Sequence, residues 1–291
     1  MDDEIELQKP STNGEGKVTE AVFHIFKDYL QTEGYSDSDQ AAIRISRLAS
    51  EHDKTLDDGF FFELWDSIFG IAEQLPYDHV AQDSVVQVMR ELTLLPDTGK
   101  TVWGAHIWSG LPVLGAALRE RLNRSRNSDV EEEQAGMDEA WVNFHAFSAR
   151  LIGAGVTSIG NLPIWMLREA LEEATPPDRH TADIALWAAA VYIEYSGPIL
   201  VEALAGNPDP VLSDETDRRI LRGGSLFKGE PGLRLERWLF WIERFKEEAE
   251  KTDSADTKEI ALRAARLMEI WNEARLKKKQ ESRGGEIGDQ V

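Results

Sequence analysis

Cysteine is absent from the 291 residues of this chain. Its absence excludes disulfides, thiolate metal sites, iron–sulfur clusters and cysteine nucleophiles together. It also fits a reducing compartment, and the acidic residues 1–4 lack the basic and apolar regions of a secretory signal. We therefore expect a cytoplasmic protein, while the basic stretch at residues 275–283 keeps a nuclear location open.

Positive charge is scarce as well. The chain has 53 Asp and Glu against 32 Lys and Arg, so its formal net charge is −21. Repulsion from phosphates opposes binding to duplex nucleic acid and to anionic membrane surfaces. We expect neither of these as a partner, and we expect a protein partner or a small apolar molecule instead.

Catalytic and metal-binding signatures are missing too. There is no His-Glu-x-x-His pair, no Gly-x-Ser-x-Gly elbow and no phosphate-binding Gly-Lys-Ser/Thr loop. Asp57 and Asp58 would suit Mg²⁺, as in class I terpene cyclases, but Phe61 stands where a third acid is needed, so they are predicted to cap a helix. His79 and Asp83 are predicted to form a surface pair rather than a metal site. We predict no cofactor and no metal, and the sequence leans against an enzyme.

What the chain has in abundance is helical apolar periodicity. Phe61, Leu64, Trp65, Ile68 and Phe69 fall at the three- and four-residue spacing of one helical face. The fold class predicted is all-α, a single multi-helical domain of about ten helices, with stacked helical pairs as one arrangement. The expected helices include residues 22–30, 61–72, 81–92, 112–124, 141–152, 167–174, 181–193, 235–245 and 260–271, with another after the capping residues 36–39.

The remaining stretches set the predicted domain limits. Residues 1–16 are acidic and without apolar periodicity, which predicts disorder, and a helical domain is expected over residues 17–276. An acidic run predicts a mobile loop near residues 125–136, and residues 277–291 are expected to form a basic, then flexible tail. Residues 101–110 fit neither a helix nor a strand. Residues 181–193 are apolar nearly all round and are predicted as a buried central helix rather than a membrane span, because Glu194 follows them.

Nine tryptophans are spread along the chain. Four of them, Trp65, Trp187, Trp238 and Trp271, continue apolar stripes and are predicted to be packing residues. Three others, Trp103, Trp108 and Trp165, lie at loops or helix starts beside polar groups. Those three indoles are therefore the ones expected to have a function.

A polar set accompanies the aromatic residues in the middle of the chain. Asn143 and Arg150 share one helical face, and Arg168 and Glu172 share another. If these faces meet, they would form a pocket for a small anionic or aromatic ligand. A structural hydrogen-bond network or surface ion pairs would explain the same residues. The candidate ligand-binding residues are Trp108, Trp141, Asn143, His145, Arg150, Trp165, Arg168 and Glu169.

Several short motifs carry a family resemblance. They include Leu92-Thr93-Leu94-Leu95-Pro96, the run WVNFHAFSARL at residues 141–151 and the run IWMLREAL at residues 164–171. Together they resemble a family of fungal intracellular proteins defined as a domain of unknown function, number 3632, over about residues 55–250. The resemblance implies a fungal origin and one helical domain. It brings no activity and no catalytic residues.

Two functions follow from these observations. The leading prediction is a non-catalytic binding or scaffold protein, because catalytic motifs are missing and the Leu-rich and aromatic helix faces suit helix-in-groove contacts. The alternative is an enzyme or carrier for a small apolar or aromatic metabolite held in a Trp-lined pocket.

Overall fold

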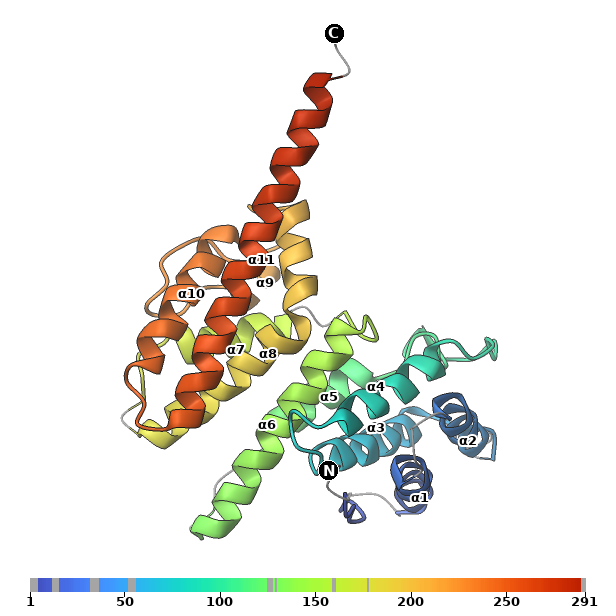
Figure 1. Cartoon of the computed structure of the whole chain (residues 1–291). Coiled ribbons are helices and arrows are strands. Elements are labelled where there is room, and N and C mark those ends of the chain that lie inside the picture. Colours follow the sequence, from blue (N-terminus) through green and yellow to red (C-terminus); the bar gives the residue numbers. More distant parts are fainter. Residues whose placement is uncertain are drawn as a thin grey trace. The chain divides into compact units, whose positions relative to one another are not determined.

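The computed structural model describes residues 5–11, 16–31, 37–51, 56–124, 128, 130–158, 161–176 and 178–288, with side chains as far as residue 277. The chain divides into two compact units, Met1–Ser158 and Ile159–Val291, here called unit 1 and unit 2. The described residues form eleven helices and one two-stranded sheet (Figure 1). The predicted all-α, multi-helical fold is confirmed, whereas the predicted domain limits of 17–276 stay a prediction.

Unit 1 is built around one central helix, α3, which packs against α1, α5 and α6. Its core is aromatic: the Phe69 ring lies 5.2 Å from the ring of Phe144 and 6.2 Å from that of Phe147, and all three side chains are buried. The elements of unit 1 are α1 (Lys17–Gln31), α2 (Ser38–Glu51), α3 (Asp58–Ala72), α4 (Val80–Thr93), β1 (Thr101–Val102), β2 (Ala105–His106), α5 (Leu114–Leu122) and α6 (Glu131–Gly153).

The start of α3 explains the aspartate pair seen in the sequence. Asp57 is the N-cap residue, and its Oδ1 accepts a hydrogen bond of 3.1 Å from the backbone N–H of Phe60. Asp58 occupies the first turn, where a negative charge complements the helix dipole. The capping role predicted for Asp57 and Asp58 is therefore confirmed.

The N-terminal segment at residues 5–11 lies against the end of α3, although the sequence predicts disorder over residues 1–16. Leu7 is buried. The backbone N–H of Gln8 donates to Gln74 Oε1 at 2.7 Å, and Gln74 Nε2 donates to the backbone C=O of Gln8 at 2.9 Å. These contacts join residues that are 66 positions apart in the sequence, so the composition of residues 1–16 alone does not indicate them. Residues 1–4 and 12–15 lie outside the described residues.

The acidic run before α6 also differs from its prediction. α6 begins at Glu131, so Glu131, Glu132 and Glu133 form its first turn rather than part of a mobile loop over residues 125–136. Carboxylates at a helix N-terminus are stabilised by the helix dipole, which favours helix over loop here. Residues 125–127 and 129 lie outside the described part of the chain.

Residues 101–113 contain the one sheet of the described residues. β1 and β2 pair antiparallel, with Thr101 opposite His106, and the turn between them is Trp103-Gly104, with φ of 52° and 77°. Positive φ at both turn residues matches the twist of a two-residue hairpin. Trp108, Leu111 and Val113 also have positive φ, which is uncommon outside glycine.

Unit 2 is built around α8, which packs against α7 and α11, while α10 packs against α11. The short helix α9 lies in a stretch for which the sequence predicts no helix. α11 reaches Gly288, so the tail predicted to be flexible from residue 277 is helical as far as that residue. The elements of unit 2 are α7 (Asn161–Leu171), α8 (Arg179–Gly206), α9 (Glu215–Ile220), α10 (Leu235–Ala249) and α11 (Ala255–Gly288).

By length and composition alone, α8 is the one helix of the described residues that could cross a membrane. However, 61% of its apolar window is buried inside the protein. Gly197 lets the Trp271 ring of α11 lie directly on the α8 backbone, where any side chain would collide with it. The prediction of a buried central helix is confirmed, and so is the packing role of Trp271.

Candidate functional site

The candidate site of unit 1 begins with a buried arginine. Arg121 of α5 donates from Nε to Glu73 Oε1 at 2.5 Å and from Nη1 to Asp66 Oδ1 at 2.6 Å, and its Nη2 also contacts Glu73. Asp66 and Glu73 are seven residues apart and so lie on one face of the α3 end. Burial alone would lower the pKa of Arg121, but the two carboxylates outweigh it and raise the pKa above its usual value.

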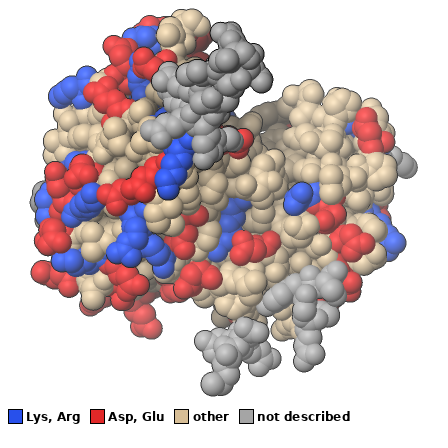
Figure 2. All heavy atoms as spheres, turned by 45° about the horizontal axis from the view of Figure 1, so that its top comes forward, with Lys and Arg blue, Asp and Glu red and all other residues tan. Residues whose placement is uncertain are grey.

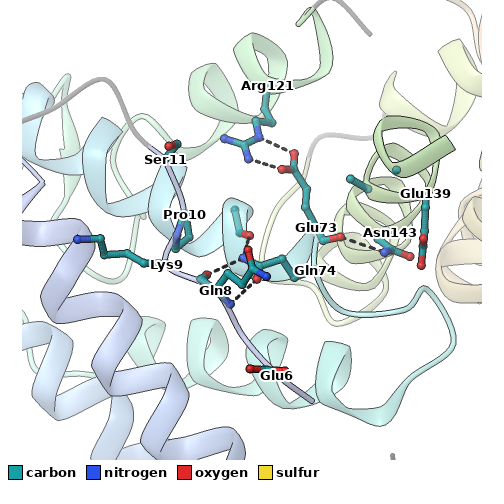
Figure 3. Close-up of a pocket in the computed structure, with 13 residues that line it drawn as sticks. Glu6, Gln8, Lys9, Pro10, Ser11, Glu73, Gln74, Arg121, Glu139 and Asn143 are labelled. Carbon is teal, nitrogen blue, oxygen red and sulfur yellow. Dashed lines mark hydrogen bonds and ion pairs between the residues drawn. The ribbon is translucent and has the colours of Figure 1, made fainter. Parts of the chain in front are cut away.

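A pocket of about 570 Å³ opens beside this cluster (Figure 3). Its wall combines the segment at residues 5–11, the end of α3, α5 and α6. The side-chain amide of Asn143 donates to the backbone C=O of Glu73 at 3.0 Å, and the backbone C=O of Asn143 accepts 3.1 Å from the Gln82 amide. These bonds fix α6 against the α3 end. Polar side chains of the wall include Gln74, Glu73, Arg121, Glu139 and Asn143, and the exposed Glu6 lies at the rim.

Arg121 also lines a second hollow of about 310 Å³. Phe62, Asp66, Glu120 and Arg124 surround it, and Arg124 pairs with Asp66 at 2.7 Å. Both cations of this hollow thus share the Asp66 carboxylate. In the larger pocket, Glu6 and Glu139 are further carboxylates of the wall.

Of the eight residues predicted to bind a ligand, only Asn143 lines the larger pocket. Trp108 is buried, with its ring centroid 6.0 Å from that of Phe61, and the ring of Trp141 lies 4.1 Å from that of His145. These three predicted residues, Trp108, Trp141 and His145, therefore contribute packing contacts within unit 1.

Arg150 is held in place by α4 and the turn before it. Its Nε donates to Asp83 Oδ1 at 3.0 Å and its Nη1 to the C=O of Tyr77 at 2.8 Å. His79 caps α4 by accepting the N–H of Ala81 at its Nδ1, so the predicted pairing of His79 with Asp83 is replaced by the Arg150–Asp83 pair. The bond from the charged Arg150 guanidinium to the Asp83 carboxylate is charge-assisted and therefore strong.

The candidates on α7 hold the connection between α8 and α10, residues 207–234, in unit 2. The Trp165 indole donates to the C=O of Ile220 at 3.0 Å, and Arg168 donates to the same C=O and to that of Arg222, each at 3.4 Å. Glu169 is exposed on the same helix. The sequence placed Trp165 and Arg168 at a ligand, and the structure places both against backbone carbonyls.

Glu172, the residue directly after α7, lies at the centre of a buried charge cluster. Its carboxylate is fully buried and accepts from Arg237 Nε at 2.5 Å and Nη2 at 3.0 Å. It also accepts from the Trp241 indole at 2.6 Å and from the backbone N–H of Gly224 at 2.8 Å. Four donors therefore satisfy one buried carboxylate, as burial of a charge requires.

Arg237 uses its remaining donors on the same connection. Its Nη1 donates to the carbonyls of Leu221 and Gly232, at 2.7 and 3.1 Å, and its Nη2 to that of Arg222 at 3.1 Å. Its guanidinium also lies 5.5 Å from the centroid of the Phe227 ring. The sequence offered no signal for Arg237, because its partners come from distant segments.

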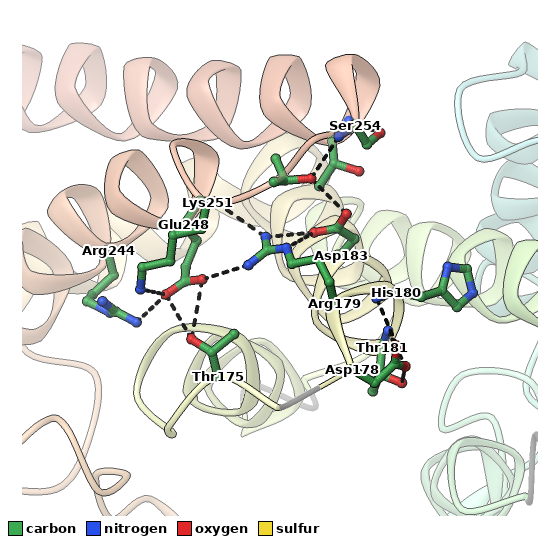
Figure 4. A network of polar contacts seen from close by, with 12 residues as sticks. Thr175, Asp178, Arg179, His180, Thr181, Asp183, Arg244, Glu248, Lys251 and Ser254 are labelled. Carbon is green, nitrogen blue, oxygen red and sulfur yellow. Dashed lines mark hydrogen bonds and ion pairs between the residues drawn. The ribbon is translucent and has the colours of Figure 1, made fainter.

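A second charge cluster joins α10 to the start of α8 (Figure 4). Glu248 accepts from Arg244 at 2.5 Å, Lys251 at 2.7 Å and Arg179 at 3.4 Å, and Thr175 donates to the same carboxylate at 3.3 Å. Burial alone would raise the pKa of Glu248, but hydrogen bonds from Lys251 and Arg179 and the charges of Arg244 and Lys251 lower it below the ordinary value.

The predicted pocket between two helical faces would need Asn143 and Arg150 of α6 to meet Arg168 and Glu172 of α7. α6 belongs to unit 1 and α7 to unit 2. Each of these side chains has partners within its own unit, so that pocket stays a prediction. Among the described residues, no group of three or more His, Asp and Glu side chains could hold a metal ion.

Trp103 is the remaining feature of unit 1. Its side chain is 67% exposed at the hairpin tip, and it is the one aromatic residue among the exposed large hydrophobic residues that the structure describes. Its indole donates to Asp58 Oδ2 at 3.1 Å, and its ring meets the Phe62 ring edge-on, with centroids 5.9 Å apart.

Acidic and basic side chains are interspersed over much of the face shown in Figure 2.

These features define an all-α protein in which the buried charged residues described above pair with one another inside each cluster. Within that class, the chain belongs to the family described as "Protein of unknown function (DUF3632)", whose model matches residues 65–245. The family resemblance found in the sequence is confirmed. No curated protein and no solved structure matches the chain. The matched stretch contains Glu73, Arg121 and Asn143 but not the segment at residues 5–11.

Proposed function

We propose that this protein is a non-catalytic binding protein that contacts a protein partner through the tip of the β1–β2 hairpin. The exposed and fixed indole of Trp103 carries this proposal. Tryptophan dominates the binding energy of many protein interfaces, because one indole buries a large apolar area and a hydrogen-bond donor together. A cytoplasmic location belongs to the same proposal and rests on the absence of cysteine.

The surroundings of Trp103 support a binding role because they fix the ring before any partner arrives. The hairpin turn sets its backbone, Asp58 accepts from its indole, and Phe62 supports one edge. A side chain that is already ordered loses less entropy when it binds, and this increases affinity. The apolar helix faces named in the sequence are largely buried within the units, so the hairpin is the better candidate contact.

The charged residues support a non-catalytic role. Arg150, Arg168 and Glu172 were among the residues expected to form a pocket for a small anionic or aromatic ligand. Each bonds to the protein itself: Arg150 to Asp83, Arg168 to two backbone carbonyls, and Glu172 to Arg237. Groups committed to structural bonds are poorly placed to act on a substrate.

The test compares Trp103→Ala with Val211→Ala in the full chain. Val211 is 90% exposed in unit 2, so its truncation removes exposed apolar surface elsewhere. A partner captured by the wild-type chain is purified and its affinity is measured directly for both variants. We expect Trp103→Ala to weaken binding by about 30-fold, which corresponds to roughly 2 kcal/mol, and Val211→Ala to have little effect. Equal affinity for both variants would contradict the proposal.

The 570 Å³ pocket favours a second candidate function, a carrier of small molecules. This pocket is within the usual size of ligand sites. Its wall is polar and contains no tryptophan, so the Trp-lined metabolite pocket expected from the sequence is not the site proposed here.

A further inference from the structure

We propose that the pocket between the segment at residues 5–11, the α3 end and α6 binds a small molecule with two or more ammonium groups. The proposal deepens the carrier candidate and is independent of the Trp103 surface. Three features of the pocket lead to it: the cations there are already paired, the carboxylates there are not all paired, and its shape is kept open.

The cations that line the pocket already have carboxylate partners. Arg121 donates to both Glu73 and Asp66, so its charge is shared by two carboxylates. Lys9 pairs with Glu20 at 3.2 Å, and this hydrogen bond and charge lower the pKa of Glu20 below its ordinary value. Each of the two cations therefore already has at least one carboxylate partner.

The acceptors are not used up in the same way. Glu6 and Glu139 line the pocket, and neither makes an ion pair or hydrogen bond with another described residue. Asn143 is 97% buried, and its amide donates to the Glu73 carbonyl while its side-chain oxygen accepts nothing from the described residues. A ligand that enters therefore meets acceptors at the floor and carboxylates at the rim.

This arrangement selects a donor-rich cation. Ammonium groups form short, charge-assisted hydrogen bonds to carboxylates and can also donate to an amide oxygen. The net charge of −21 attracts cations at long range and repels anions. Because Glu139 comes from α6 and Glu6 from the N-terminal segment, two separate ammonium groups fit the pocket better than one.

Glycine keeps the space available. A Cβ built on Gly136 of α6 meets no atom within 4 Å, although this glycine lies inside a helix, where glycine is unfavourable. On the opposite wall, a Cβ on Gly70 would come within 2.6 Å of Pro10 Cβ, so only glycine lets the N-terminal segment approach this closely. Gly136 therefore faces open space, and Gly70 lets the N-terminal segment pack closely against α3.

The test is calorimetric titration of the full chain with spermidine at low salt, with inorganic phosphate as the anionic comparison. Glu139→Gln removes one exposed carboxylate of the pocket without changing its shape. Glu132→Gln is the matched control, because Glu132 is exposed on the same helix outside the pocket. We expect at least a fivefold loss of spermidine affinity for Glu139→Gln, less than a twofold loss for Glu132→Gln, and no phosphate binding.

A steric variant makes the test independent of charge. Gly136→Phe should fill the pocket and reduce spermidine affinity more than tenfold, while Gly136→Ala should retain it; thermal unfolding of both variants checks that they fold. Trp103→Ala should bind spermidine normally, which separates this proposal from the protein-binding function. The proposal is overturned if spermidine shows no saturable binding. It is also overturned if Glu139→Gln and Glu132→Gln lose the same affinity, because spermidine would then be attracted only by the overall negative charge of the protein.

Discussion

Unit 1 and unit 2 both contain buried charge, but the exposure of the paired carboxylates differs. In unit 1 the buried partner is the cation, Arg121, while the side chains of Asp66 and Glu73 remain 20% and 24% exposed at the pockets. In unit 2 the buried partners include the carboxylates of Glu172 and Glu248, which are 0% and 3% exposed. Glu172 and Glu248 are thus enclosed by protein donors, whereas Asp66 and Glu73 remain partly exposed.

Enclosed carboxylates such as Glu172 hold the fold together, whereas partly exposed carboxylates such as Glu73 can also contact a ligand. A buried ion pair adds little net stability, but removing one partner is costly because the other is left buried and unpaired. Glu172 and Arg237 are such a pair, and together they attach the connection at residues 207–234 to α7 and α10. Changes in the two units should therefore have very different consequences, and the variants below test that expectation from the largest effect to the smallest.

The largest effect is expected from Glu172→Gln. It keeps the side-chain size but leaves Arg237 without a counter-charge in a fully buried position, so unit 2 should lose about 3–5 kcal/mol of stability. Glu173→Gln is the control, because Glu173 is an exposed neighbour that accepts one bond from Ser225, and it should cost less than about 1 kcal/mol. Amide hydrogen exchange resolved by segment should show faster exchange in α7 and α10 for Glu172→Gln, with unit 1 unchanged. Equal effects of the two variants would remove the distinction between enclosed and exposed carboxylates.

A smaller effect is expected from acid. The pKa of Glu248 is lowered in the folded protein, so the unfolded chain takes up this proton at a higher pH than the folded one. The stabilisation is complete above the ordinary glutamate pKa of about 4.3 and is lost as the pH falls through the lower, folded value. Because hydrogen bonds to charged groups contribute about 1.5–3 kcal/mol, the loss should be of that order.

The measurement is urea unfolding between pH 6 and pH 3, followed by exchange in α8 and α10. Glu248→Gln should be less stable than the wild type at pH 6 and should flatten the dependence of unit 2 stability on pH. A parallel decline of variant and wild type below pH 5 would mean that other carboxylates govern the acid response.

The fold could be predicted from the sequence where its causes are local. Apolar residues at helical spacing report a buried face within a few turns, so the α3 and α4 helices and the burial of Trp65 and Trp238 follow from the sequence directly. The β1–β2 hairpin could not be predicted in this way, because Trp103, and not only Gly104, adopts positive φ in its turn. A tryptophan at that position gives no turn signal.

The candidate site could be predicted only in part, because its contacts join distant segments. Asn143 was named from the sequence and lines the pocket, but Arg121 and Glu73 were not, since 48 residues separate them and neither belongs to a motif. The same limit explains Trp165, which looked like a ligand residue beside polar groups. Its actual partner, the Ile220 carbonyl, is 55 residues away.

The smallest and most specific test of unit 1 uses its two pocket glycines. Gly70→Ala should push Pro10 away, expose Leu7 and break the Gln8–Gln74 bonds, with a net loss of about 1–2 kcal/mol from crowding and lost burial. Gly136→Ala places its methyl group in open space and should stabilise α6 by roughly 0.5–1 kcal/mol. Thermal unfolding shows whether each variant is stabilised or destabilised. Amide hydrogen exchange at residues 5–11 shows whether the N-terminal segment has been displaced.

If Gly70→Ala lowers the stability and Gly136→Ala raises it, the N-terminal segment packs against α3 as part of the unit 1 site. This segment lies outside the stretch matched by the family. Spermidine titration of Gly70→Ala then sharpens the comparison with unit 2. If displacing the segment removes binding while Arg121 stays paired with Glu73, the open acceptors of unit 1 depend on that segment, whereas the enclosed carboxylates of unit 2 depend only on their own donors. Equal exchange at residues 5–11 in both variants would instead place the segment outside the site, and the pocket would consist of α3, α5 and α6 alone.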